Sequence, residues 1–210
     1  MLEIVKLVLG PVQTNTYLVA DPQTNEAVVI DPAWDGEQIL ESAREKGWRI
    51  TNIWLTHAHF DHFGGAAAVA DGSSPMPPVG LHPDDYPLWR NNGGAAFFGL
   101  QMDPGPEPTI ALTDGMQMHI GSNLIEVRHA PGHTRGHVLF YVPGESLVFC
   151  GDVIFHRSIG RTDLPGGDYH QLMASIQTQV LTRPDETRLL SGHGVETTVG
   201  IERKYNGFLL

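Results

Sequence analysis

The chain has 210 residues, of which 41% are hydrophobic and 18% are charged, and its formal net charge is −11. This composition is typical of a folded protein and excludes a disordered tail. The length predicts one domain, residues 1–210. The negative charge argues against a nucleic-acid partner. Because Cys150 is the only cysteine, an internal disulfide is excluded, and a metal ion would need His and carboxylate ligands.

The first residues alternate between apolar and polar side chains, with Glu3 and Lys6 among the apolar ones. This pattern predicts a strand and not a signal peptide. No stretch approaches the ~20 apolar residues of a membrane span. We therefore expect a cytoplasmic protein without a membrane partner.

The first half of the sequence contains short apolar runs and segments with helical spacing. The runs predict strands at 4–9, 16–19, 27–30, 50–55 and 79–81. Helical spacing predicts helices at 36–46, ended by Gly47, and at 66–70 and 84–90. Residues 91–108 (NNGGAAFFGLQMDPGPEP) predict a long loop with Phe97 and Phe98 exposed or half-covered. Such a loop is either a lid or binding loop, or an insertion without structure.

The second half repeats the same plan. Strands are predicted at 116–120, 123–128, 138–142, 147–149 and 188–190, and helices at 169–181 and 198–205. Strands grouped in each half, with helices flanking them, predict an α+β fold in which two mixed sheets pack face to face with helices outside.

Four separate segments place metal-binding side chains directly after a predicted strand and close to glycine. They are THAHFDH (56–62), PGHTRGH (131–137), GD (151–152) and GHG (192–194). Strand ends hold side chains rigidly, and glycine lets the backbone turn tightly or approach an ion. Imidazole and carboxylate ligands suit zinc, iron or manganese.

Spacing within the first segment separates two groups of ligands. His57 and His59 are two residues apart, so in an extended segment both point toward one ion. Asp61 and His62 follow a bend and can face a second ion. A lone HxH after a strand is usually a polar turn, whereas HxHxDH followed in order by the other three segments is typical of metal binding.

The remaining segments complete both groups. His133 and His193 can each add one ligand to an ion, and Asp152 can bridge the two ions, as carboxylates do in two-metal sites. The pattern therefore predicts a two-metal site.

With these motifs the chain resembles the hydrolases of the metallo-β-lactamase fold, and among them the glyoxalase II (hydroxyacylglutathione hydrolase) group. The likeness runs from LGPVQTNTYLVAD near the start to GIERKYNGF near the end. It implies an αββα sandwich. It also implies a first metal held by His57, His59 and His133, and a second held by Asp61, His62 and His193, with Asp152 between them.

The chain departs from the larger enzymes of that group. It lacks their helical C-terminal domain, and SIGRTDLPGGD (158–168) matches the short, single-domain bacterial type. Arg161 falls where the larger enzymes place a lysine that contacts glutathione. Gly194 and Val195 stand where those enzymes have a tyrosine, and Gly207 replaces a proline.

The resemblance implies hydrolysis of S-acylglutathione-type thioesters, S-lactoylglutathione above all, by a hydroxide that bridges two divalent ions. Zinc is the first expectation, with iron or manganese as alternatives. We expect Asp61 to orient the hydroxide as the catalytic residue. Arg161 is the candidate for binding a substrate carboxylate, because a guanidinium pairs with carboxylate in a fork. The partner is then a small thioester, while the oligomeric state stays open.

The main alternative is a persulfide dioxygenase, an enzyme with one iron that acts on glutathione persulfide. The chain also resembles that family, which has the same fold and carries a GRTD segment. A β-lactamase is disfavoured by Asp152, since those enzymes usually have Cys or Ser there. RNA processing is disfavoured by the negative charge. A binding module without catalysis would retain metal but turn over no thioester, and the seven intact ligand positions disfavour it.

Overall fold

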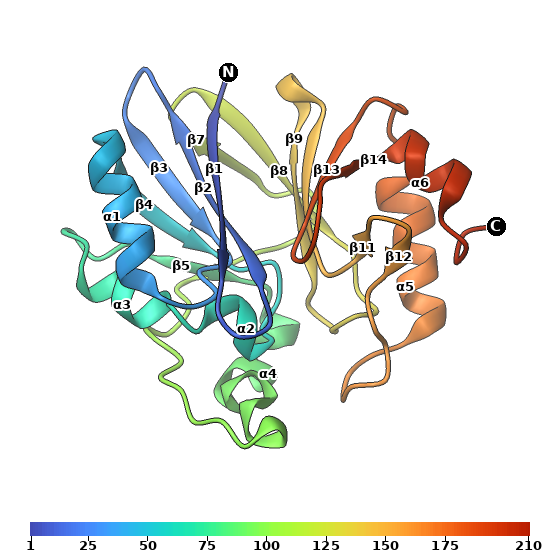
Figure 1. Ribbon diagram of the computed structural model, residues 1–210, viewed down its shortest axis with the longest axis horizontal. Helices are drawn as coiled ribbons and strands as arrows, with labels where there is room; N and C mark the ends of the chain where they lie inside the picture. Colours follow the sequence, from blue (N-terminus) through green and yellow to red (C-terminus); the bar gives the residue numbers. More distant parts are fainter.

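The strand β2 (Thr14–Asp21) shows how the chain builds layers. Every residue of β2 is buried. Leu18 packs into one hydrophobic cluster and Val19 into another, because successive side chains of a strand point to opposite faces of the sheet. Both faces of this sheet must therefore pack against other layers. The computed structural model, which describes residues 1–210, shows helices on one face and a second sheet on the other (Figure 1).

The first sheet has six strands in chain order: β1 (Glu3–Leu9), β2, β3 (Glu26–Ile30), β4 (Arg49–Trp54), β5 (Val79–Leu81) and β6 (Ile110–Ala111). The pairs from β1 to β3 are antiparallel, and those from β3 to β6 are parallel. Two helices cover its outer face: α1 (Gly36–Lys46) and α3 (Ala66–Asp71). Gly47 ends α1 in a left-handed conformation with φ of 69°, which glycine adopts at little cost.

The second sheet has the order β14, β13, β10, β9, β8, β7. Its strands are β7 (Gln117–Ile120), β8 (Asn123–His129), β9 (Val138–Val142), β10 (Leu147–Gly151), β13 (Arg188–Ser191) and β14 (Thr197–Thr198). Its outer helices are α5 (Tyr169–Ser175), continued by the π-helical turn η4 (Ile176–Val180), and α6 (Val199–Tyr205). A small hairpin of β11 (Ile154–Phe155) and β12 (Ser158–Ile159) follows β10.

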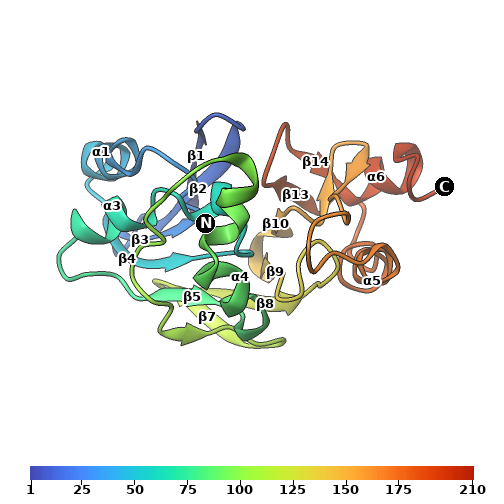
Figure 2. The ribbon, with the colours of Figure 1, turned by 90° about the horizontal axis from the view of Figure 1, so that it is seen from below.

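Three hydrophobic clusters confirm the layers. Between the first sheet and its helices lie 21 buried residues, between the two sheets 17, and between the second sheet and its helices 11. Figure 2 shows α1 and α3 on one side of the sheets and α5 and α6 on the other. The predicted fold class, an αββα sandwich, is thus confirmed. None of the helices has the length and apolar character needed to cross a membrane.

Several short elements differ from the sequence-based predictions. The predicted loop 91–108 contains a 3-10 helix, η2 (Asn92–Phe98), which follows η1 (Pro83–Asp85) and α4 (Tyr86–Arg90). The short helix α2 (Phe60–Phe63), the turn η3 (Pro143–Glu145) and the two-residue strands lack enough residues to show a period. The predicted helix 169–181 changes to π geometry after Ser175.

Candidate metal centre

Four connections at one end of the two sheets supply the candidate ligands. The chain leaves β4 through His57 and enters α2 after His59, so that Asp61 and His62 lie on α2. His133 lies between β8 and β9. Parallel pairing sets Gly151 of β10 beside Ser191 of β13, and this register brings the residues that follow, Asp152 and His193, to the same place. The structure therefore brings all seven sequence-predicted ligands together.

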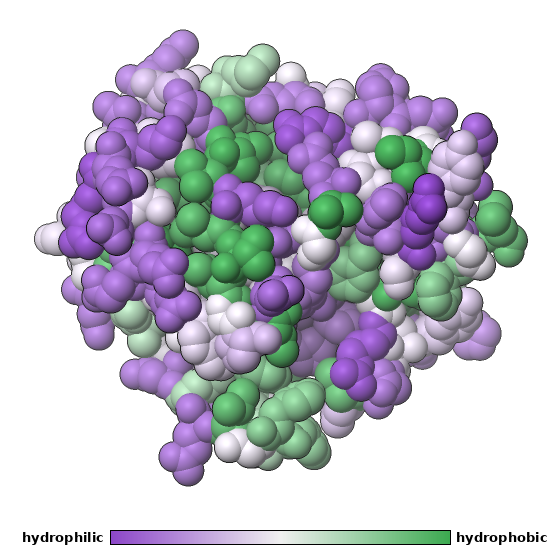
Figure 3. All heavy atoms as spheres, in the orientation of Figure 1, coloured by the Kyte–Doolittle hydropathy of each residue, from purple (hydrophilic) through white to green (hydrophobic).

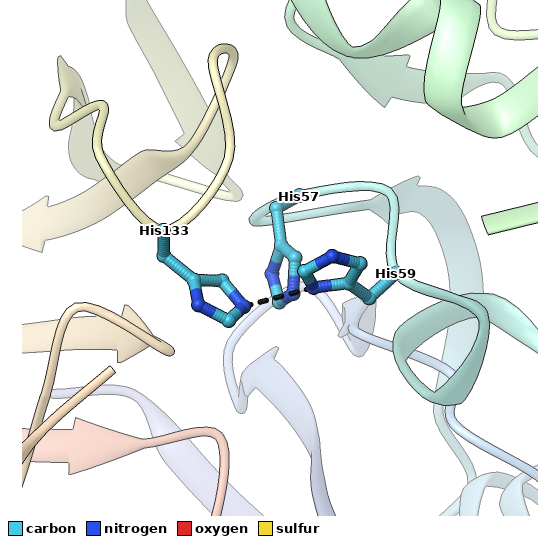
Figure 4. Close-up of side chains that lie close together, drawn as sticks. All are labelled: His57, His59 and His133. Carbon is cyan, nitrogen blue, oxygen red and sulfur yellow. Dashed lines mark hydrogen bonds between the residues drawn. The ribbon is translucent and has the colours of Figure 1, made fainter. Parts of the chain in front are cut away.

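Three imidazoles form a first group (Figure 4). The Nδ1 atom of His59 lies 2.8 Å from the Nε2 atom of His133. The ring of His57 lies 4.9 Å from that of His59 and 4.8 Å from that of His133, measured between centroids. His57 and His133 are buried almost completely. Three ring nitrogens that converge in this way match the ligand set of a transition-metal ion.

Asp61, His62 and His193 form a second group beside the first. The Oδ2 atom of Asp61 lies 3.5 Å from Nε2 of His62 and 3.3 Å from Nε2 of His193. The carboxylate of Asp152 lies between the groups, since its oxygens are 3.4 Å from Nε2 of His62 and 3.6 Å from Nε2 of both His133 and His193. This is the position that a bridging carboxylate needs.

Several polar atoms of the centre are buried without a hydrogen-bond partner. They include Nε2 of His57, Nε2 of His62 and Oδ1 of Asp152. Leaving such atoms unpaired costs about 1–3 kcal/mol each, and all three are good ligand atoms for a divalent cation. The donor set thus fits metal ions.

Hydrogen bonds on the far side of the rings fix which nitrogen is free. Nδ1 of His62 donates to Asp31 at 3.0 Å, and Nδ1 of His133 donates to the carbonyl of Arg161 at 2.8 Å. Nδ1 of His57 lies 3.0 Å from Oγ1 of Thr56, whose hydroxyl donates to Asp31. Each ring therefore presents Nε2, and not Nδ1, to a cation, as outer partners arrange in many metal sites.

The pKa values of the histidines shift in opposite directions in the two groups. In the first, burial lowers the pKa of His57 well below its usual value, and burial lowers the pKa of His59 to about 3. In the second, burial alone would lower the pKa of His62, but the carboxylates of Asp152, Asp61 and Asp31 raise it well above its usual value. Burial would raise the pKa of Asp61, but His62 and His193 lower it to about 2, so this carboxylate stays ionised.

Asp31 supports the centre and lies outside the four motifs. Its carboxylate accepts hydrogen bonds from the backbone N–H and the hydroxyl of Thr56, both at 2.7 Å, as well as from His62. Asp31 has a φ of 51°, a conformation that costs free energy for a residue other than glycine. The signal was present, because Asp31 also comes directly after a strand, β3, which pairs with β4.

Asp85 is a second residue outside the motifs, and it joins two ligand loops. Its carboxylate accepts hydrogen bonds from the backbone N–H of Ala58 at 2.9 Å, from the hydroxyl of Thr134 at 2.8 Å and from the backbone N–H of Gly136 at 2.7 Å. Ala58 lies between His57 and His59, and Thr134 follows His133. No pattern around Asp85 indicates this role, since its partners are distant in sequence.

Glycine allows the close approach at Asp152. A Cβ atom on Gly192 would lie 2.3 Å from Oδ1 of Asp152, so a larger residue would displace that carboxylate. His137, which the sequence left outside the ligand set, is fully buried, and its Nε2 atom accepts the backbone N–H of Asp152 at 3.0 Å. Both residues position Asp152.

The ligands open onto a cavity of about 310 Å³. Its lining includes His59, Asp61 and His193. Arg161 also lines it, but the guanidinium is held in a fork by Asp163, with N–O distances of 2.8 and 2.7 Å. The structure therefore brings Arg161 to the cavity with the Nε and Nη2 edge of its guanidinium already paired with a neighbour.

Curated relatives match the chain along most of its length. It is 38% identical to a probable metallo-hydrolase, YqgX, of Bacillus subtilis, with 97% of this chain and 96% of the relative covered. It is 34% identical to the hydroxyacylglutathione hydrolase GloC of Haemophilus influenzae, with 94% and 93% covered.

Solved structures are similar over the whole fold. BLEG-1 B3 metallo-beta-lactamase superposes with a TM-score of 0.89 at 38% identity, with 100% of this chain and 99% of that chain covered. TTHA1623 in a di-iron-bound form has a TM-score of 0.88 at 41% identity, with 98% and 100% covered. ETHE1 from Myxococcus xanthus has a TM-score of 0.81 at 26% identity, with 98% and 83% covered.

The model of one protein family matches residues 9–193, a range that includes every candidate ligand. The two ligand groups and the family together support the binding of divalent metal ions. The chain belongs to the metallo-beta-lactamase superfamily.

Proposed function

We propose that the chain is a metal-dependent hydrolase that cleaves S-acylglutathione-type thioesters, with S-lactoylglutathione, which gives lactate and glutathione, as the reference substrate. The observation that carries this proposal is the pair of ligand groups that share Asp152 at one end of a cavity. The identity with the hydroxyacylglutathione hydrolase GloC along nearly the whole chain supports the choice of substrate class.

Two divalent ions, bound by the groups described above, would lower the pKa of a water molecule and stabilise negative charge on the carbonyl oxygen. Asp61 is suited to orient that water. Its carboxylate lines the cavity, remains ionised, and is steadied by a hydrogen bond from the hydroxyl of Thr14 at 3.1 Å. It can accept a hydrogen bond from the water and direct an oxygen lone pair toward the thioester carbonyl.

Arg161 is our candidate for binding a carboxylate of the substrate. Nε and Nη2 of the guanidinium donate to Asp163, so the carboxylate of the substrate would bind the remaining N–H groups or exchange with that of Asp163. Both side chains are more than half exposed, and solvent screens the attraction between exposed charges. The exchange is therefore inexpensive.

The likeness to ETHE1 from Myxococcus xanthus favours keeping a second candidate, a persulfide dioxygenase with one iron. The two candidates differ in the number of metal ions. The likeness to TTHA1623 in a di-iron-bound form supports the two-metal proposal.

One set of measurements on untagged protein tests the proposal. We expect two equivalents of metal per chain and hydrolysis of S-lactoylglutathione, without oxygen uptake on glutathione persulfide. One equivalent of iron with persulfide-dependent oxygen uptake would favour the second candidate. Nitrocefin, a β-lactam, belongs in the same assay because of the likeness to BLEG-1, and its hydrolysis without thioesterase activity would contradict the proposal.

A further inference from the structure

One side of the cavity is an aromatic wall, which we define as Phe60, Leu88, Phe97 and Phe98. The wall comes from α2, α4 and η2, which adjoin one another at the lower end of the molecule (Figure 1). Figure 3, in the same orientation, shows hydrophobic residues gathered over this region, beside a recess in the face. Phe97 is 72% exposed and Phe98 is 52% exposed. Large apolar side chains held at the mouth of a cavity indicate a surface that an apolar ligand covers.

The wall is fixed to the candidate metal centre. Phe60 stands between His59 and Asp61 in the chain, and its ring lies 5.1 Å from that of Phe98. Gly93 brings the backbone of η2 against Phe60, where a Cβ atom would lie 2.3 Å from the Phe60 nitrogen. Gly93 has a φ of 61° and is buried. An apolar group on the wall would therefore lie next to the residues that hold the metals.

The charge of the cavity also favours an apolar ligand on the aromatic wall. Arg161 is the only Lys or Arg among the lining residues, and Asp163 neutralises it. A strongly polar acyl group would meet no free cation on the aromatic side. The cavity volume of about 310 Å³ lies within the range of small-molecule sites, about 300–1,000 Å³. The small lactoyl group would leave most of the aromatic wall uncovered.

We propose that the aromatic wall binds an apolar acyl group, so that thioesters of medium-chain acids are preferred to S-lactoylglutathione. This inference rests on the proposed function, because it uses the two branches of a glutathione thioester. The thiol branch carries the carboxylates and is directed to Arg161. The acyl branch leaves the same carbonyl carbon in another direction and covers Phe97 and Phe98.

Binding of thioethers, which cannot be hydrolysed, tests the wall independently of catalysis. Calorimetry on the metal-loaded protein would compare S-hexylglutathione with S-methylglutathione. We expect S-hexylglutathione to bind at least about tenfold more tightly, since each buried methylene adds to affinity. The double variant Phe97→Ala/Phe98→Ala should reduce this ratio below about threefold. Phe208→Ala is the matched control, because Phe208 is 50% exposed and does not line the cavity.

The outcomes separate this inference from the proposed function. Equal affinities in the wild type, no measurable binding of S-hexylglutathione, or a ratio unchanged in the double variant would overturn the aromatic wall. Circular dichroism and metal content would establish that the double variant is folded. In turnover, we expect kcat/KM for S-hexanoylglutathione to exceed that for S-lactoylglutathione at least tenfold. Hydrolysis of S-lactoylglutathione without this preference would leave the proposed function intact and overturn the inference.

Discussion

The Nδ1 atom of His59 lies 2.8 Å from the Nε2 atom of His133, and the two residues follow strands of different sheets. His59 comes after β4 of the first sheet, and His133 follows β8 of the second. A cation held between these nitrogens therefore links the two halves of the sandwich.

We expect metal removal to lower the thermal stability. A ligand at about 1,000 times its Kd stabilises the folded state by about 4 kcal/mol, which in a chain of this size corresponds to a fall in Tm on the order of 10 °C on chelation. Differential scanning calorimetry with and without EDTA measures the fall. His59→Ala should show a smaller chelator effect, whereas His119→Ala, an exposed histidine outside the site, should behave as the wild type does.

Acidification should release the two metal ions in sequence. Protons compete with metal for the ring nitrogens, and a ligand whose pKa is raised in the metal-free protein is protonated at higher pH. Burial lowers the pKa of His133, as it does for His57 and His59. For His193, burial is outweighed by the hydrogen bond to Asp61 and by Asp152, so the pKa is raised, as it is for His62. The second group should lose its metal first as pH falls, and metal content after dialysis between pH 7 and 4 would reveal two steps. Release of both ions in one step would contradict this order.

Asp61→Ala should lower kcat for thioester hydrolysis by about 100-fold or more, because the group that orients the water is lost. Circular dichroism should be unchanged, since Asp61 lines the cavity and supports no backbone of the core. Asp71→Ala, at an exposed end of α3, is the control. An Asp61→Ala variant with wild-type turnover would remove Asp61 from the mechanism.

Asp85→Ala should destabilise the fold by at least about 3 kcal/mol, because three buried donors lose their acceptor at about 1–3 kcal/mol each. The variant should also bind metal more weakly, since Asp85 joins the loops of His57 and His133. Asp84→Ala provides a neighbouring control, as the Asp84 side chain is 60% exposed. Urea unfolding and metal titration measure both effects, and equal behaviour of the two variants would disprove the role of Asp85.

Arg161 and Asp163 should have opposite effects on substrate binding. Arg161→Ala should raise KM for S-lactoylglutathione several-fold while it leaves KM for a small thioester without the peptide unchanged. Asp163→Asn should lower KM for the glutathione thioester, because it weakens the competition for the guanidinium. Equal changes for both substrates in Arg161→Ala would contradict carboxylate binding.

Periodicity and motif spacing predicted much of this molecule. Each long element has its own period and its own stop signal, such as Gly47 after α1, and these are local properties of the chain. The segment THAHFDH and its three companion segments could be recognised as one set because each follows an apolar strand. The strand end is a local feature, and it alone places the side chain at the edge of a sheet.

Only the tertiary structure decided how the two halves meet. The hydrogen bonds of Asp31 and Asp85 join segments 25 to 51 residues apart. The aromatic wall depends on η2 packing against Phe60, a contact that residues 91–108 do not encode in any period. Such contacts follow from packing of distant segments, which a pattern along the chain does not describe.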